Sequence, residues 1–137
     1  MGRIVAIDFG TKRTGVAITD PLNIVASGLT TVPTQNVLSY LEALFQKEQF
    51  LTLVVGKPVQ KMGNPSEVEA AILSFIEQFQ SRCPKVQVER FDERFTSKLA
   101  MRAMIDAGVR KKKRQNKALV DQISATIILQ DYLKTRS

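Results

Sequence analysis

Apolar runs alternate with stretches of helical spacing along most of the chain. Continuous or alternating apolar residues predict strands, and apolar residues three or four positions apart predict helices. The strands are expected at about residues 4–7, 15–19, 24–32, 51–56 and 86–91. The helices are expected at about residues 36–49, 65–79, 96–108 and 117–133.

The order of these elements predicts an α/β fold. Three strands come first, followed by helix, strand, helix and strand, so the sheet should be mixed, five-stranded and flanked by helices. Its beginning should be antiparallel, and its later strands should be joined by parallel crossovers. Residues 1–137 are expected to form a single domain, because no repeat or flexible linker divides them.

Asp8 is the first polar residue that the pattern does not explain. The apolar run from Ile4 to Ile7 leads directly into it, and a short turn predicts a hairpin whose first strand lies inside the sheet. An unpaired carboxylate there is costly, so Asp8 needs a cation, a set of donors or a chemical role. Open α/β sheets bind ligands at the carboxyl ends of parallel strands, where Asp8 is expected.

A second candidate acid lies at the end of the last expected strand. Asp92 and Glu93 are adjacent there, and side chains alternate across a strand, so only one of them can face the site of Asp8. We favour Glu93, because the neighbouring Arg94 offers Asp92 an ion pair.

Asp121 is the third candidate and lies in the last expected helix. It shares a helical face with Ala125, Ile128 and Tyr132, and burial of this face would direct Asp121 toward the sheet. A core carboxylate satisfied by a backbone donor or a nearby lysine is the alternative. Otherwise three inward carboxylates predict a hard-cation site, because oxygen ligands suit Mg²⁺ or Mn²⁺.

The other acidic residues have simpler explanations. Asp20 precedes Pro21 and is expected to stabilise a turn. Several glutamates on the polar faces of the helices are expected to be solvated: Glu42, Glu48, Glu67, Glu69 and Glu77.

Composition narrows the chemistry. The chain has no histidine, which excludes Ser-His and Cys-His nucleophilic sites and histidine-based zinc sites. The one cysteine, Cys83, excludes an internal disulfide, is expected to be buried and idle, and fits a reducing, cytoplasmic compartment. No stretch is long enough to span a membrane and no signal peptide is visible, so a membrane is not an expected partner.

Basic residues outnumber acidic ones, and the formal charge of +7 favours polyanionic partners. The excess is dense in residues 109–117, directly before the helix of Asp121. A solvated loop is one explanation, but beside an acidic metal site the run predicts contacts to a nucleic-acid backbone. The residues expected to make these contacts are Arg110, Lys111, Lys112, Lys113, Arg114 and Lys117.

Four segments together resemble a known bacterial family. They are AIDFGTKRTGVA from residue 6, VVGKP from residue 54 with a later Gly63, FDERFTS from residue 91 and VDQISA from residue 120. In this order they are similar to the motifs of a family variously described as Holliday-junction resolvases and pre-16S rRNA nucleases. The resemblance runs from about Arg3 to Tyr132 and implies a ribonuclease H-like fold.

The resemblance also implies an activity, that of a metal-dependent phosphodiesterase. Asp8, Glu93 and Asp121 would be its catalytic acids and metal ligands, holding two Mg²⁺ or Mn²⁺ ions about 4 Å apart. The favoured reaction trims the 5′ end of the 16S rRNA precursor, with the immature ribosomal subunit as a further candidate partner. Branched DNA stays open, because it presents the same phosphodiester. Outside the basic run, the expected backbone contacts are Lys12, Arg13, Lys57 and Lys61.

One position departs from the family pattern. Many members have Asn-Met-Asp-Gly after the fourth strand, where this chain has Met62 in place of the acid, so Lys57 and Lys61 are expected to contribute there instead. Two other functions stay open. A strand followed by Asp-x-Gly-Thr also resembles the phosphate loop of actin-like ATPases, and a non-catalytic nucleic-acid-binding module would use the acids structurally.

Overall fold

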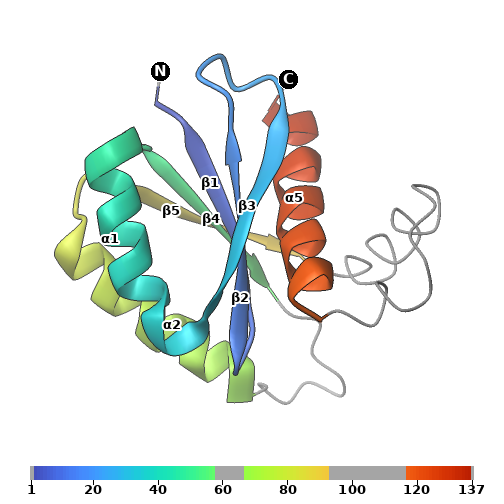
Figure 1. Cartoon of the computed structure of the whole chain (residues 1–137). Helices are drawn as coiled ribbons and strands as arrows, with labels where there is room; N and C mark the ends of the chain where they lie inside the picture. Colours follow the sequence, from blue (N-terminus) through green and yellow to red (C-terminus); the bar gives the residue numbers. More distant parts are fainter. Residues whose placement is uncertain (1, 58–66, 93–116, 137) are drawn as a thin grey trace.

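Five strands form one mixed sheet in a computed structural model that describes residues 2–57, 67–92 and 117–136 (Figure 1). The spatial order is β3–β2–β1–β4–β5, antiparallel across the first three strands and parallel from β1 through β4 to β5. The predicted α/β sheet is therefore confirmed. The strands are β1 (Ile4–Phe9), β2 (Arg13–Thr19), β3 (Ala26–Pro33), β4 (Thr52–Lys57) and β5 (Gln87–Asp92).

Helices cover both faces of this sheet (Figure 1). A short 3-10 turn (Thr34–Asn36) leads into α1 (Val37–Glu48), which lies with α2 (Glu67–Arg82) on one face. Helix α5 (Lys117–Arg136) lies on the other face. The helix predicted at residues 96–108 lies outside the described residues. Within them, no helix has the length and apolar character needed to cross a membrane.

The two faces of the sheet differ in the size of their buried side chains. Against α1 and α2 the core contains large residues, and the rings of Phe50 and Phe79 stack with their centroids 6.4 Å apart. Against α5 the sheet presents smaller residues, with Ala6, Ala17 and Ala26 beside Ile4 and Val54. Small side chains let a helix approach a sheet closely, so α5 can lie nearer to the strands than it could if they carried large side chains on this face.

Two glycines in the sheet show how close this approach is. A Cβ atom at Gly15 of β2 would lie 2.0 Å from the backbone oxygen of Asp121 in α5. A Cβ atom at Gly28 of β3 would lie 2.7 Å from Nε2 and 2.8 Å from Cγ of the Gln122 side chain. Glycine is therefore required at position 15 to leave room for the backbone of α5.

The turn between β2 and β3 is held by Asp20, as predicted. The amides of Val25 and Ile24 each donate to Asp20 Oδ1 at 2.7 Å, and these bonds, led by that of Val25, keep the pKa of Asp20 below its usual value. Asn23 Nδ2 donates to the carbonyl oxygen of Gly2 at 3.0 Å, so this loop contacts the start of the chain.

Both ends of the described chain lie at one pole of the fold (Figure 1). Gly2 contacts the β2–β3 loop, and Leu133 and Lys134 near the end of α5 line a hollow beside the same loop. The carboxyl end of β1 points to the opposite pole. Cys83 is buried as predicted, and desolvation raises the pKa of its thiol.

Replacement of Gly15 should destabilise the protein far more than replacement of Gly28. We expect Gly15→Ala to lower the free energy of unfolding by about 3 kcal/mol, because its methyl group would meet the backbone of α5. Gly28→Ala meets mainly the flexible Gln122 side chain and should cost about 1 kcal/mol or less. Urea denaturation of both variants measures the difference, and equal losses would contradict the close seating of α5.

Candidate functional site

Asp8 lies near the end of β1 with its side chain on the α5 face of the sheet. Its partner across the β1–β2 pair is Gly15, and directly opposed residues of an antiparallel pair share a face. The face is identified by the missing Cβ of Gly15, which would meet the backbone of Asp121. Asp8 is half-buried, so its carboxylate lies between the interior of the fold and solvent.

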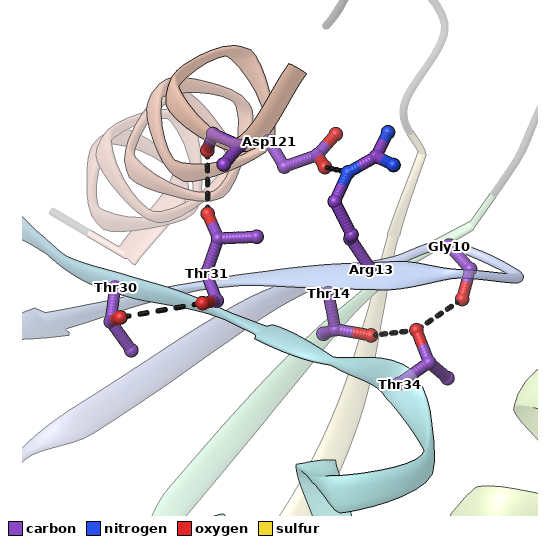
Figure 2. Close-up of polar contacts among 8 residues, drawn as sticks. Gly10, Arg13, Thr14, Thr30, Thr31, Thr34 and Asp121 are labelled. Atoms are coloured by element: carbon purple, nitrogen blue, oxygen red, sulfur yellow. Dashed lines mark hydrogen bonds and ion pairs between the residues drawn. The ribbon is translucent and has the colours of Figure 1, made fainter. Parts of the chain in front are cut away.

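Asp121 enters the same region from the second turn of α5. Its neighbours on the helix, Ala125, Ile128 and Tyr132, are buried against the sheet, which confirms the predicted orientation of this face. The hydroxyl of Thr31 donates to the carbonyl oxygen of Ala118 at 2.5 Å and fixes the first turn of α5 to β3 (Figure 2). Asp121 is therefore held beside the end of β1, as the metal-site prediction requires.

Among the residues that the structure describes, Arg13 forms an ion pair with Asp121. Its Nε atom donates to Asp121 Oδ2 at 3.0 Å, and the two side chains point toward one another from β2 and α5 (Figure 2). The sequence predicted a lysine or backbone donor as the alternative partner of Asp121 and assigned Arg13 to nucleic-acid backbone contacts. Arg13 and Gly15 are two residues apart and therefore share the face of β2 that α5 covers.

A threonine pair fixes the turn that follows Asp8. The Thr34 hydroxyl donates to the carbonyl oxygen of Gly10 at 2.6 Å and lies 2.9 Å from the hydroxyl of buried Thr14 (Figure 2). The amide of Thr34 also donates to the carbonyl oxygen of Lys12 at 3.0 Å. These contacts hold the β1–β2 turn in place, and the Lys12 side chain in this turn is exposed. Nothing in the local sequence pattern indicated Thr34.

Lys57 is the other predicted phosphate contact that the structure describes with its side chain exposed. It ends β4, which runs parallel to β1, so Lys57 lies at the same edge of the sheet as Asp8. Its side chain has the parity of Leu53 and Val55, which pack against α1 and α2, so it belongs to the α2 face of that edge. Lys117 begins α5, but its side chain is outside the described part. The other predicted site residues also lie outside the described ranges: Lys61, Glu93, Arg110, Lys111, Lys112, Lys113 and Arg114, together with the departure at Met62.

Alternation along β5 bears on the choice between Asp92 and Glu93. Phe91 packs against the α5 cluster, whereas Arg90 bonds to Glu69 of α2 on the opposite face. Asp92 has the parity of Arg90 and so belongs to the α2 face. The acid that shares a face with Asp8 is therefore not Asp92.

The expectation that Glu69 is solvated was wrong. Glu69 is buried, and its two carboxylate oxygens accept bonds of 2.7 and 2.9 Å from Arg90. Hydrogen bonds from Arg90 hold the pKa of Glu69 below its usual value against the effect of burial, and the charges of Arg90 and Lys57 also lower it. The sequence contained a signal of this burial, because Glu69 has helical spacing with the apolar residues Ile72 and Phe79.

The same arginine secures the ends of the parallel strands. Arg90 also donates to the carbonyl oxygens of Val55 at 3.3 Å and Gly56 at 3.2 Å, at the end of β4. Because these strands lead to the edge where Asp8 lies, the Arg90–Glu69 pair supports the frame of the site from the α2 side.

The described residues fit part of a divalent-cation site. Asp8 and Asp121 provide carboxylate oxygens on one face, and such ligands suit Mg²⁺ or Mn²⁺. Among the residues that the structure describes, no three histidine, cysteine or acidic side chains gather closely enough to hold a metal ion. The predicted third ligand, Glu93, is outside that part of the chain.

Comparisons with known proteins agree with this architecture. The family described as "RuvX: Holliday junction resolvase" matches residues 2–135. A Flavobacterium psychrophilum protein named "Putative pre-16S rRNA nuclease" is 53% identical over 133 residues, which cover 97% of each chain. A Phocaeicola vulgatus protein of the same name is 53% identical over 136 residues, 99% of this chain and 98% of that protein.

A solved structure supports the fold assignment. Thermus thermophilus RuvC in complex with a Holliday junction substrate has a TM-score of 0.59 and 13% identity, covering 99% of this chain and 96% of that chain. RuvC has a ribonuclease H-like fold, so the predicted fold class is confirmed.

Loss of the Arg90–Glu69 pair should destabilise the protein in a pH-dependent way. Ionised Glu69 contributes stability above its unfolded-state pKa, and this contribution is lost as pH falls through its lowered folded-state pKa. We expect Glu69→Gln to lower the free energy of unfolding by about 2 kcal/mol at pH 7, with the difference narrowing below about pH 4.

Glu42→Gln is the matched control for this measurement. It removes the more exposed Arg82–Glu42 pair and should cost about 0.5 kcal/mol or less. Urea denaturation across the pH range tests both variants, and a pH-independent loss in Glu69→Gln would contradict the role of its charge.

Proposed function

The chain belongs to the RuvX family, and on that basis we propose that it is a nuclease that hydrolyses phosphodiester bonds at the 5′ end of the 16S rRNA precursor. The family match confirms the resemblance carried by the four sequence segments. Relatives about half identical to this chain over nearly its whole length are named for that substrate. This extent of similarity favours a nuclease over an actin-like ATPase domain.

One observation carries the proposal: Asp8 and Asp121 occupy the same face of the sheet at the carboxyl end of β1. Gly15 provides the space that brings them there, since it opposes Asp8 and lies under the backbone of Asp121. Two carboxylates in a chain without histidine are suited to metal-assisted hydrolysis rather than to nucleophilic or histidine chemistry.

Asp8 and Asp121, with Glu93 as the third ligand, would hold a divalent cation in this proposal, Mg²⁺ or Mn²⁺, with two ions expected. Such cations activate water and stabilise the leaving oxygen of a phosphodiester. The rigid β1–β2 turn keeps Asp8 oriented, and the first turns of α5 keep Asp121 oriented. The absence of a histidine base is then no obstacle.

Exposed lysines around the site would hold the substrate backbone. Lys12 and Lys57 lie at the same edge of the sheet as Asp8, with Lys57 on the α2 face of that edge, and there they can attract phosphates without reading bases. In this proposal Lys61 and the basic residues among 110–117 also contact substrate phosphates. The immature ribosomal subunit is the assembly in which the substrate would be met.

Branched DNA is the second candidate substrate. The family description names a Holliday junction resolvase, and the same site would act on the phosphodiesters of either nucleic acid. Incubation of the purified protein with pre-16S RNA and with a four-way DNA junction, in Mg²⁺ or Mn²⁺, followed by mapping of the cut ends, distinguishes the two substrates. Binding without cleavage of either would instead support a non-catalytic module.

Removal of either charge at the site should abolish most cleavage while the fold is kept. Asp8→Asn and Asp121→Asn preserve side-chain shape but weaken metal binding, so we expect losses of about 100-fold or more in turnover. Asp92→Asn is the matched control, because Asp92 belongs to the other face of the sheet and should retain near wild-type turnover. Full activity in folded Asp8→Asn protein would contradict the metal site.

Neutralisation of the basic run should weaken binding rather than chemistry. Replacing Lys111, Lys112 and Lys113 together with glutamine should lower nucleic-acid affinity at low salt. The slope of log affinity against log salt should become shallower by about 0.7 to 0.9 for each phosphate that the protein no longer neutralises. A salt titration with single-turnover cleavage at saturating protein measures both effects. An unchanged slope would mean that the run is a solvated loop and that the backbone contacts are made by Lys12, Arg13, Lys57 and Lys61 instead.

A further inference from the structure

We propose that Arg13 is an exchangeable counter-cation of Asp121: its guanidinium holds the carboxylate in the metal-free protein and leaves it when a divalent cation binds. The freed guanidinium then becomes available to a substrate phosphate. This inference rests on the proposed function, since it describes how the same site changes between its metal-free and metal-bound states.

The position of Asp121 is fixed, whereas that of Arg13 can change. The backbone of Asp121 rests on Gly15, and its helix is bonded to Thr31 of β3. Arg13 reaches Asp121 through a long side chain that is 38% exposed, compared with 23% for Asp121. A cation entering from solvent therefore meets a carboxylate on a fixed backbone and an arginine side chain that can move away.

The bonding pattern distinguishes this pair from a structural one. Arg90 uses both terminal nitrogens to bond both oxygens of Glu69, in an ion pair whose side chains are 24% and 9% exposed. Arg13 bonds Asp121 through Nε, and its terminal nitrogens point away from the carboxylate (Figure 2). A buried pair with two parallel hydrogen bonds is suited to a permanent structural role. A partly exposed pair bonded through Nε is suited to displacement of the arginine by another cation.

Charge supplies the reason for exchange. Carboxylates brought together for a metal repel one another when it is absent, and the positive charge of Arg13 reduces this repulsion. Once a divalent cation is bound, the same positive charge repels it. Arg13 should therefore stabilise the metal-free protein and weaken metal binding. Because linkage is reciprocal, release of its guanidinium by the metal should also favour phosphate binding.

The test is Mn²⁺ affinity, measured by titration calorimetry on the metal-free full chain without nucleic acid. We expect Arg13→Gln to bind Mn²⁺ about three- to tenfold more tightly than the wild type, because a competing charge is gone. Arg13→Lys keeps the charge and should bind like the wild type. Arg3→Gln is the matched control, because it removes the same charge from a pair with Glu48 at the start of β1 and should leave the affinity unchanged.

The melting temperature separates exchange from a structural role. Without metal, Arg13→Gln should melt at a lower temperature than the wild type, and saturating Mn²⁺ should narrow this difference. Equal or weaker Mn²⁺ affinity in folded Arg13→Gln protein overturns the exchange and leaves the proposed nuclease intact. Absence of Mn²⁺ and Mg²⁺ binding in the wild type overturns both.

A measurement on the wild type needs no stable Arg13→Gln protein. The Nε–Hε resonance of Arg13, assigned by its absence in Arg13→Lys, should shift as Mg²⁺ is titrated, because its bond to Asp121 breaks. A resonance that stays in place while the protein binds Mg²⁺ overturns the exchange.

Discussion

The close packing of α5 on a sheet face rich in glycine and alanine is the constraint on which the site depends. Gly15 has no side chain because the backbone of Asp121 occupies that space, and Gly28 admits the Gln122 side chain in the same way. The acid on the helix is thereby placed beside the acid on β1. A larger residue at position 15 would push Asp121 away from Asp8. The packing of α5 and the pairing of the two acids therefore both require glycine at this position.

The opposite face of the sheet supplies the large buried side chains that the α5 face has few of. Large phenylalanine side chains between the sheet and the two helices α1 and α2 bury most of the bulky apolar groups, and burial of this kind is the main source of stability. The α5 side can then accommodate half-buried charges near one end. The two ion pairs also lie on different faces of the sheet. The permanent pair, Arg90–Glu69, is on the α2 side, and the exchangeable pair, Arg13–Asp121, is on the α5 side.

Local patterns in the sequence predicted the elements that the structure describes, the mixed sheet, the place of Asp8 at a strand end and the inward face of Asp121. They did not predict Arg13–Asp121, which joins residues 108 positions apart, because strand and helix periodicity contains no information on which distant side chains pair. The burial of Glu69, in contrast, could be predicted from the sequence. Its helical spacing placed it on the buried face of its helix, but glutamate side chains are usually solvated, and this general tendency gave the wrong prediction. The ligand assignment of Glu93 stays a prediction.

The placement of both chain ends beside the β2–β3 loop has a practical consequence. β1 runs from this pole toward Asp8, and α5 returns from Asp121 toward it, so neither end approaches the acids (Figure 1). A tether or fused protein attached through Gly2 or beyond Arg136 would extend away from the edge of the sheet where Asp8 lies. Immobilised by either end, the molecule would present that edge to a long nucleic acid in solution.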